Sequence, residues 1–147
     1  MSRKIIGFDA FGEFPQTECK SDKVWRENWI EETKGEFLTE EELYDSLNLK
    51  KVSNVELIKG DIRETLDIYT TDHPNLRISL LHIDTDVYEP AKKALEVLYD
   101  RVIPGGLIVS DDYGIAGETR AFDEFFGQKL NLHKFPFSHN KPVFIIK

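Results

Sequence analysis

Cysteine is nearly absent from this sequence, and so are the residue clusters that hold structural zinc. The 147 residues include a single cysteine, Cys19, so no internal disulfide can form. Structural zinc sites need grouped cysteines and histidines, and the sequence has no such group. We therefore expect a protein of a reducing, cytoplasmic compartment that folds without disulfides or zinc.

Long apolar segments and several common catalytic motifs are missing as well. No window approaches the roughly 20 apolar residues of a transmembrane helix, and Asp9 and Glu13 interrupt the first apolar run too early for a signal peptide. The sequence lacks the P-loop, G-x-S-x-G and C-x-x-C motifs, which leaves phosphate-loop, hydrolase and redox functions without support. The length predicts one soluble domain over residues 1–147.

Positive charge is in short supply. Lysine and arginine number 19 against 27 aspartates and glutamates, which gives a net charge of −8. Such a surface repels phosphate backbones and anionic headgroups, so we expect neither a nucleic-acid nor a membrane partner. Hydrophobic residues still make up 40% of the chain, enough for a folded core rather than disorder.

The apolar pattern predicts an α/β fold. Near-continuous apolar runs are typical of strands buried on both faces of a parallel sheet, and they occur at residues 4–8, 55–58, 78–83 and 107–109. Helical patterns lie at residues 39–47, 62–69, 89–98 and 118–128. Residues 104–106 (PGG) predict a break before the fourth strand. Residues 132–137 and 143–146 predict an antiparallel hairpin. Together these features indicate a doubly wound, Rossmann-like, mostly parallel sheet that ends in this hairpin.

An insertion at residues 13–34 separates the first strand from the next helix. Trp25 and Trp29 are four residues apart, so they would share one helix face. Two interpretations stay open: a packing pair under a surface insertion, or a lid that forms a substrate-facing wall.

Aspartates follow every expected parallel strand. We call them the acidic rim, and its members are Asp9, Asp61, Asp84, Asp86, Asp111 and Asp112. Ligands of open α/β sheets bind outside the carboxyl ends of the strands. One aspartate after a strand is ordinary turn chemistry, but crowded carboxylates repel each other unless something positive lies among them. The pattern therefore favours a ligand site over a set of turn residues.

Two kinds of ligand suit such a rim. Asp84, Asp111 and Asp112 follow consecutive strands and are the best candidates for a cation site. Oxygen ligands favour magnesium, with calcium or manganese as alternatives, over zinc. Asp9 and Asp61 lie on the other half and suit the hydroxyls of a nucleoside. His82 lies inside the third strand, where we expect a packed, hydrogen-bonded core histidine.

Several segments resemble the macrocin O-methyltransferase (TylF-like) family. They are residues 7–15 (GFDAFGEFP), 59–61 (KGD) with 65–66 (TL), 81–89 (LHIDTDVYE) and 104–113 (PGGLIVSDDY). The resemblance runs nearly from end to end. It implies an O-methyltransferase that depends on S-adenosylmethionine and a divalent metal, and that acts on a hydroxyl of a sugar or other natural-product-like small molecule.

The resemblance also implies a cofactor site. Asp9 matches the acidic residue that holds the ribose hydroxyls, and Asp61 and Ile62 match the pair that flanks the adenine. Ala10 departs from the family, which often has serine there, and so removes one expected cofactor contact.

The same resemblance implies roles for the remaining carboxylates. Asp84, Asp111 and Asp112 match the metal ligands, and Asp86 matches the general base that takes a proton from the acceptor hydroxyl.

A family strand and its glycine turn, which precede the segment matching residues 4–8, have no counterpart in this sequence. The resemblance places that strand between the strands at 4–8 and 78–83. We expect a fragment of a longer enzyme, or a shortened inactive relative, that binds S-adenosylmethionine weakly. We further expect either that the two half-sheets close on each other, or that a second copy covers the exposed edges as a homo-oligomer.

Two other functions compete with methyl transfer. A non-catalytic α/β binding domain could use the same rim. A phosphoacceptor receiver domain also gathers aspartates around magnesium, but its acidic pair follows the first strand, whereas Asp111 and Asp112 come late here. The methyltransferase interpretation accounts for more of the rim.

Overall fold

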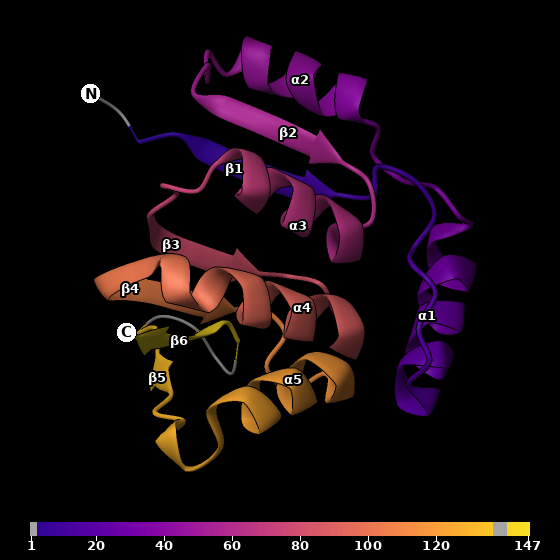
Figure 1. Ribbon diagram of the computed structural model, residues 1–147. Coiled ribbons are helices and arrows are strands. Elements are labelled where there is room, and N and C mark those ends of the chain that lie inside the picture. Colours follow the sequence, from indigo (N-terminus) through magenta and orange to yellow (C-terminus); the bar gives the residue numbers. More distant parts are fainter. Residues whose placement is uncertain (1–2, 137–140) are drawn as a thin grey trace.

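The computed structural model describes residues 3–136 and 141–147 and shows strands alternating with helices along the chain (Figure 1). Its elements are β1 (Ile5–Asp9), α1 (Lys20–Thr33), α2 (Glu40–Leu49), β2 (Val55–Lys59), α3 (Ile62–Asp72), β3 (Ile78–Ile83), α4 (Tyr88–Leu98), η1 (Tyr99–Arg101), β4 (Val102–Ser110), α5 (Ala116–Phe126), η2 (Gly127–Lys129), β5 (His133–Lys134) and β6 (Val143–Ile146). This order confirms the expected α/β class. Within the described ranges, no helix is long and apolar enough to span a membrane.

The strands form two sheets rather than one. β1 pairs in parallel with β2, while the other sheet has the order β3-β4-β6-β5, with β3 parallel to β4 and β6 antiparallel to both of its neighbours. The expectation that the half-sheets close on each other is wrong, because β1 and β3 belong to separate sheets in the described part of the chain. The arrowheads of β1 to β4 point the same way in Figure 1, so their carboxyl ends share one side of the molecule. Coverage of the edges by a second copy stays a prediction.

Strand β4 is longer than the sequence indicated. It begins at Val102 and runs through the PGG segment that was expected to break the chain. The segment stays in the sheet because the register shifts between Ile78 and Leu80, while Gly105 takes a φ of 78° that favours glycine. Gly105 N–H also donates to the Lys147 carbonyl oxygen at 2.7 Å, which ties this irregular stretch to the C-terminus.

The C-terminal hairpin is present but short on one side. β5 covers only His133–Lys134 and pairs antiparallel with β6. Residue 137 of the expected strand, and most of the connection at 138–142, lie outside the described residues. The capping box expected at the start of α2 is confirmed. The Thr39 side chain accepts a hydrogen bond from Glu42 N–H, and the Glu42 side chain accepts one from Thr39 N–H.

The core lies between the β3–β4 sheet and helices α3, α4 and α5. Its most buried apolar side chains are Leu66, Ile83, Leu95, Ile108 and Phe122. Each contributes about 1.5–3 kcal/mol by leaving water. This packing fixes one face of β3 and β4 against the helices.

His82 is not a core residue, which corrects the sequence expectation. Side chains of a strand alternate between the two sheet faces. Because Leu81 and Ile83 point into the core, His82 points to the opposite face and its side chain is 49% exposed.

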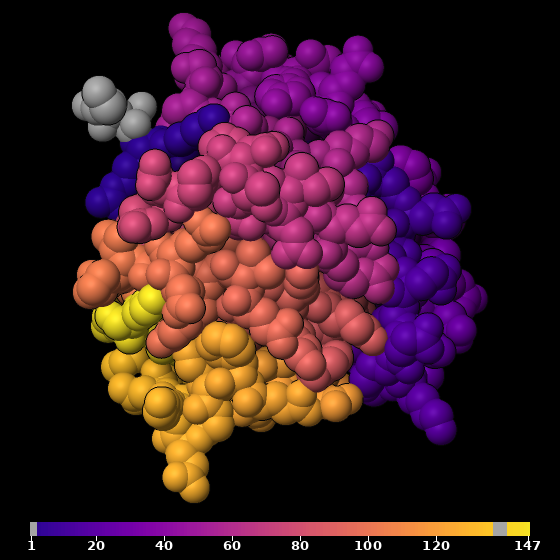
Figure 2. All heavy atoms as spheres, in the orientation of Figure 1, coloured from indigo at the N-terminus to yellow at the C-terminus, as the bar shows by residue number. Residues whose placement is uncertain are grey.

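The insertion before α2 forms helix α1, and its two tryptophans do share a face. Phe14 packs against both Trp25 and Trp29, with ring centroids 5.9 and 5.4 Å apart. The buried carboxylate of Asp22 accepts a hydrogen bond from Tyr88 N–H at 2.8 Å, which fixes α1 to the start of α4. Figure 2 shows the indigo atoms of this segment along one side of the molecule, against the pink and orange atoms of α3 and α4.

Candidate functional site

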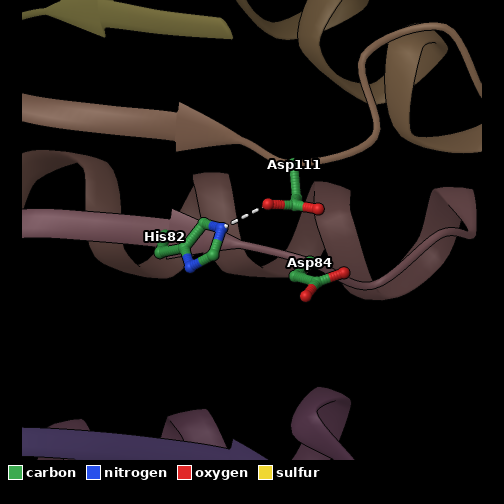
Figure 3. Close-up of side chains that lie close together, drawn as sticks. All are labelled: His82, Asp84 and Asp111. Carbon is green, nitrogen blue, oxygen red and sulfur yellow. Dashed lines mark hydrogen bonds and ion pairs between the residues drawn. The ribbon is translucent and has the colours of Figure 1, made fainter. Parts of the chain in front are cut away.

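The ends of β3 and β4 bring two rim carboxylates side by side. Asp84 follows β3 and Asp111 follows β4. The backbone N–H of Asp111 donates to the Ile83 carbonyl oxygen at 2.9 Å, so the ladder between the strands continues one residue past β4. Figure 3 shows Asp84 and Asp111 beside His82, whose Nε2 lies 2.9 Å from Asp111 Oδ1.

The rim residues assemble into two overlapping groups. In one, single ligand atoms of His82, Asp84 and Asp111 all lie within 4.8 Å of one another. In the other, the same holds for Asp84, Asp86 and Asp112. Asp84 belongs to both. The three carboxylates expected to hold a metal are therefore divided between the groups, and their metal-binding role stays a prediction.

Burial and neighbouring carboxylates raise the pKa of two members of the rim. Partial burial, with the charges of Asp111 and Asp112, raises the pKa of Asp84. Burial, with a hydrogen bond from the protonated Asp86 carboxyl to Asp112 and the charges of Asp112 and Asp84, raises the pKa of Asp86 to about 8. Among the described residues, Lys141 lies beside this part of the rim, with its Nζ 2.8 Å from Asp112 Oδ1. This donor set fits a divalent cation, which would stabilise the ionised carboxylates.

A buried glutamate that the sequence analysis missed holds the loops of the rim together. Glu118 of α5 is fully buried, and its Oε2 accepts from Thr85 N–H at 3.1 Å. Its Oε1 accepts from Ser110 Oγ at 2.6 Å and from Asp112 N–H at 3.2 Å. Burial raises the pKa of this carboxyl group. The sequence did hold a signal, since Glu118 lies four residues before Phe122 and so shares its buried helix face.

Asp9 and Asp61, the carboxylates expected to bind the cofactor, differ in how free they are. Asp9 is exposed at the end of β1, and its Oδ1 accepts from Phe11 N–H at 2.6 Å. Asp61 caps α3 through Arg63 N–H and also binds the Arg63 guanidinium, with Nε 2.9 Å from Oδ1. The hydrogen bond from Arg63 lowers the pKa of Asp61. Asp9 therefore has the more available carboxylate, while Asp61 shapes the start of α3.

One cavity of about 500 Å³ joins the two halves of the rim. Its lining includes Asp9 from the end of β1 and Asp84 and Asp86 from the loop after β3, with Ile62 and Trp29 among the apolar residues. The volume falls within the usual range for small-molecule sites. Because Trp29 lines the cavity and also packs on Phe14, the insertion serves as both a packing element and a wall.

Comparison with known proteins places this architecture in a family. The profile of the family described as macrocin-O-methyltransferase (TylF) matches residues 1–138. The chain belongs to the TylF family. This TylF-family chain is 28% identical over 131 residues to the 8-demethyl-8-(2,3-dimethoxy-alpha-L-rhamnosyl)-tetracenomycin-C 4'-O-methyltransferase of Streptomyces olivaceus. The matched region covers 86% of this chain and 48% of that enzyme. The chain thus spans about half the length of the curated relative.

Solved structures share the fold of the TylF-family chain. The O-methyltransferase NovP matches with a TM-score of 0.79 and 20% identity, over 100% of this chain and 61% of its own. The calicheamicin methyltransferase CalS11 matches with a TM-score of 0.70 and 22% identity, over 98% of this chain and 60% of its own. These matches confirm the methyltransferase-like α/β fold, of which the chain forms a part.

Proposed function

We propose that this chain forms the cofactor- and cation-binding part of an S-adenosylmethionine-dependent O-methyltransferase that acts on a sugar-like hydroxyl. The family match supplies the reaction class. The observation that carries the proposal is a cavity whose lining includes both Asp9, at the end of β1, and Asp84 and Asp86, after β3. A cofactor and an acceptor bound in it would lie side by side.

The cofactor end would hold the adenosine. The exposed Asp9 carboxylate would accept hydrogen bonds from the ribose hydroxyls, as carboxylates after a strand do in dinucleotide sites. Ile62 and Leu57 line the cavity and give an apolar wall for the adenine. Asp61, fixed by Arg63, would hold the turn that places Ile62.

The other end would carry the chemistry. A divalent cation held by rim carboxylates supplies Lewis acidity that lowers the pKa of an acceptor hydroxyl. Asp86 would take the proton of the acceptor hydroxyl. At the same time the acceptor oxygen would form a bond to the methyl carbon, and the bond from that carbon to the cofactor sulfur would break. Raised to about 8 by burial and by the neighbouring carboxylates, the pKa of Asp86 would fall beside a cation, which favours the ionised base.

The acceptor class follows from the walls and from the relatives. Trp29, Phe14 and Phe37 line the cavity near residues 13–43 and offer aromatic surface to the apolar face of a sugar ring. The Streptomyces olivaceus relative is named for methylation at a 4' hydroxyl of a rhamnosyl compound. A deoxysugar hydroxyl is the acceptor that we propose for the whole enzyme.

Calorimetric titration with S-adenosylhomocysteine tests the cofactor site. We expect saturable binding to the wild-type chain, weakened about tenfold or more by Asp9→Asn, because hydrogen bonds to a charged group contribute about 1.5–3 kcal/mol each. Asp45→Asn is the matched control, since Asp45 is an exposed carboxylate on α2. Absence of binding up to about 1 mM, or equal binding by the Asp9 variant, would contradict the proposal.

A non-catalytic binding domain is the second candidate, favoured by the separation of β1 and β3 into different sheets. It would bind S-adenosylhomocysteine but transfer no methyl group. An assay with methyl-labelled S-adenosylmethionine, a divalent cation and a panel of deoxysugar acceptors distinguishes the two. Transfer that is lost in Asp86→Ala with cofactor affinity intact supports the enzyme, and binding without transfer supports the binding domain.

A further inference from the structure

Residues 14–19 lead into helix α1 and run beside the cavity, and we call them the strap. The strap has no helix or strand of its own, so its position depends on side chains that bind its backbone. Phe14 and Pro15, at its start, line the cavity. Phe14 also packs on Trp29, another lining residue, with ring centroids 5.4 Å apart. The strap therefore carries part of the aromatic wall that the proposed acceptor would face.

Side chains of two helices hold the two ends of the strap. At its start, Arg26 Nε of α1 donates to the carbonyl oxygens of Phe14 and Pro15, at 3.0 and 3.1 Å. Toward its other end, the Glu89 carboxylate of α4 accepts from Glu18 N–H at 2.9 Å. Because this N–H donates to a group outside the strap, its exchange with solvent reports local opening of the strap.

The middle of the strap is held by Arg63 of α3. Its Nη1 donates to the Gln16 carbonyl oxygen at 3.1 Å. The rest of the guanidinium binds the Asp61 carboxylate: Nε lies 2.9 Å from each carboxylate oxygen, and Nη2 also donates to Oδ2. A guanidinium presents five N–H donors in one plane, so it binds a carboxylate along one edge and still has a donor for a carbonyl group.

Arg63 therefore joins two walls of the cavity. Asp61 caps α3 by accepting from Arg63 N–H at 2.9 Å, and the next residue, Ile62, lines the cavity where we place the adenine. On the other side of the guanidinium, Gln16 lies two residues after Phe14 of the aromatic wall. The lining that the described residues form does not include Arg63, whose side chain is 36% exposed. Arg63 acts on a bound molecule only through the residues that it holds.

We propose that Arg63 is a positioning residue, which keeps the acceptor wall of the cavity in a fixed place relative to the turn that receives the cofactor. This inference rests on the proposed function and adds to it a residue that touches neither cofactor nor acceptor. A molecule bound against Ile62 restrains the start of α3, and Arg63 passes that restraint to Gln16 and so to Phe14. Reacting groups must be close and aligned, so a displacement of about 1 Å in one wall costs about 100-fold in rate.

Hydrogen exchange of the full chain, measured by mass spectrometry with and without S-adenosylhomocysteine, tests this link. In the wild type we expect the ligand to slow exchange in the turn at residues 60–62 and also in the strap, by about fivefold or more, which is an ordinary size for coupling between sites. In Arg63→Lys we expect slowing in the turn but not in the strap, because an ammonium group lacks the planar fork that binds both partners. Since the Arg63 side chain lies outside the core, the variant should keep the wild-type circular dichroism spectrum.

Arg26→Lys is the matched control, since Arg26 binds the strap but not the turn. We expect it to speed exchange of the strap in the free chain, while the ligand still slows the strap as in the wild type. If Arg63 were only a structural support, the two variants would behave alike.

The free chain gives a second measurement that does not depend on the proposed function. Without ligand, Arg63→Lys should exchange the amides of the strap faster than the wild type. Equal exchange in the free wild type and variant, or a ligand effect on the strap that survives in Arg63→Lys, would overturn the inference. If the ligand slows neither segment in the wild type, the proposed cofactor site is wrong, and the free-chain comparison still decides whether Arg63 holds the strap.

Discussion

Removal of the Glu118 carboxylate should loosen the acidic rim more than any other change in the buried polar groups. Three donors converge on it: Thr85 N–H, Ser110 Oγ and Asp112 N–H. Thr85 lies in the loop after β3, and Asp112 lies in the loop after β4. Glu118 therefore fixes the spacing of the two loops that carry the candidate cation ligands.

The magnitude follows from the donors that Glu118→Ala leaves unpaired. Each buried unsatisfied group costs about 1–3 kcal/mol, and water entering the space left by the side chain offsets part of the sum. We expect the free energy of unfolding to fall by about 3–5 kcal/mol, as for other broken buried charge networks. Displacement of these loops should also lower the affinity for Mn²⁺ about 10–100-fold, which is the usual effect of losing a group that orients metal ligands.

The control is a second buried carboxylate that does not touch the rim loops. Asp22 accepts from Tyr88 N–H and holds α1 in place, so Asp22→Ala should destabilise the fold and leave Mn²⁺ affinity unchanged. Urea unfolding gives the stabilities, and calorimetry gives the affinities. Glu118→Gln keeps the volume and carries the test if the alanine variant does not fold. A folded Glu118 variant with wild-type Mn²⁺ affinity would refute the reasoning.

Two further predictions concern other contacts. Burial and hydrogen bonds to Glu56 and Asp123 raise the pKa of Tyr69 and of Tyr113 to about 12. Since the unfolded chain loses these protons nearer pH 10, the free energy of unfolding should decrease from pH 10 to about 12, and tyrosinate absorbance should show two groups ionising late; their ionisation at pH 10 would contradict this. In Gly117→Ala the new Cβ would lie 2.3 Å from an Asp22 oxygen, so urea unfolding should show a loss of about 1–3 kcal/mol, and unchanged stability would mean that α1 is not held there.

Local apolar patterns were sufficient to predict most of the fold. β1, β2 and β3 were located to within one residue, because their apolar runs are nearly unbroken. β4 was shortened in the prediction because proline and glycine usually end a strand, whereas here a register shift keeps them in the sheet. The separation of the sheets depends on tertiary contacts that no local pattern reports.

The candidate site was predictable in its members more than in its grouping. The position of the aspartates after the strands was visible in the sequence, but their division between two groups depends on how the loops after β3 and β4 meet in the folded chain. His82 was assigned to the core because an apolar run surrounds it, although the alternation with Leu81 and Ile83 points it outward. The helix position of Glu118 indicated that it is buried, but its three donors, Thr85, Ser110 and Asp112, come together only in the folded chain.

Anomalous diffraction from crystals grown with S-adenosylhomocysteine and Mn²⁺ tests the central claim most directly. The account predicts a manganese peak within coordination distance of Asp84, and adenosine density in the cavity with the ribose hydroxyls on Asp9. A manganese ion bound away from the acidic rim, or a cofactor bound outside the cavity, would contradict the account.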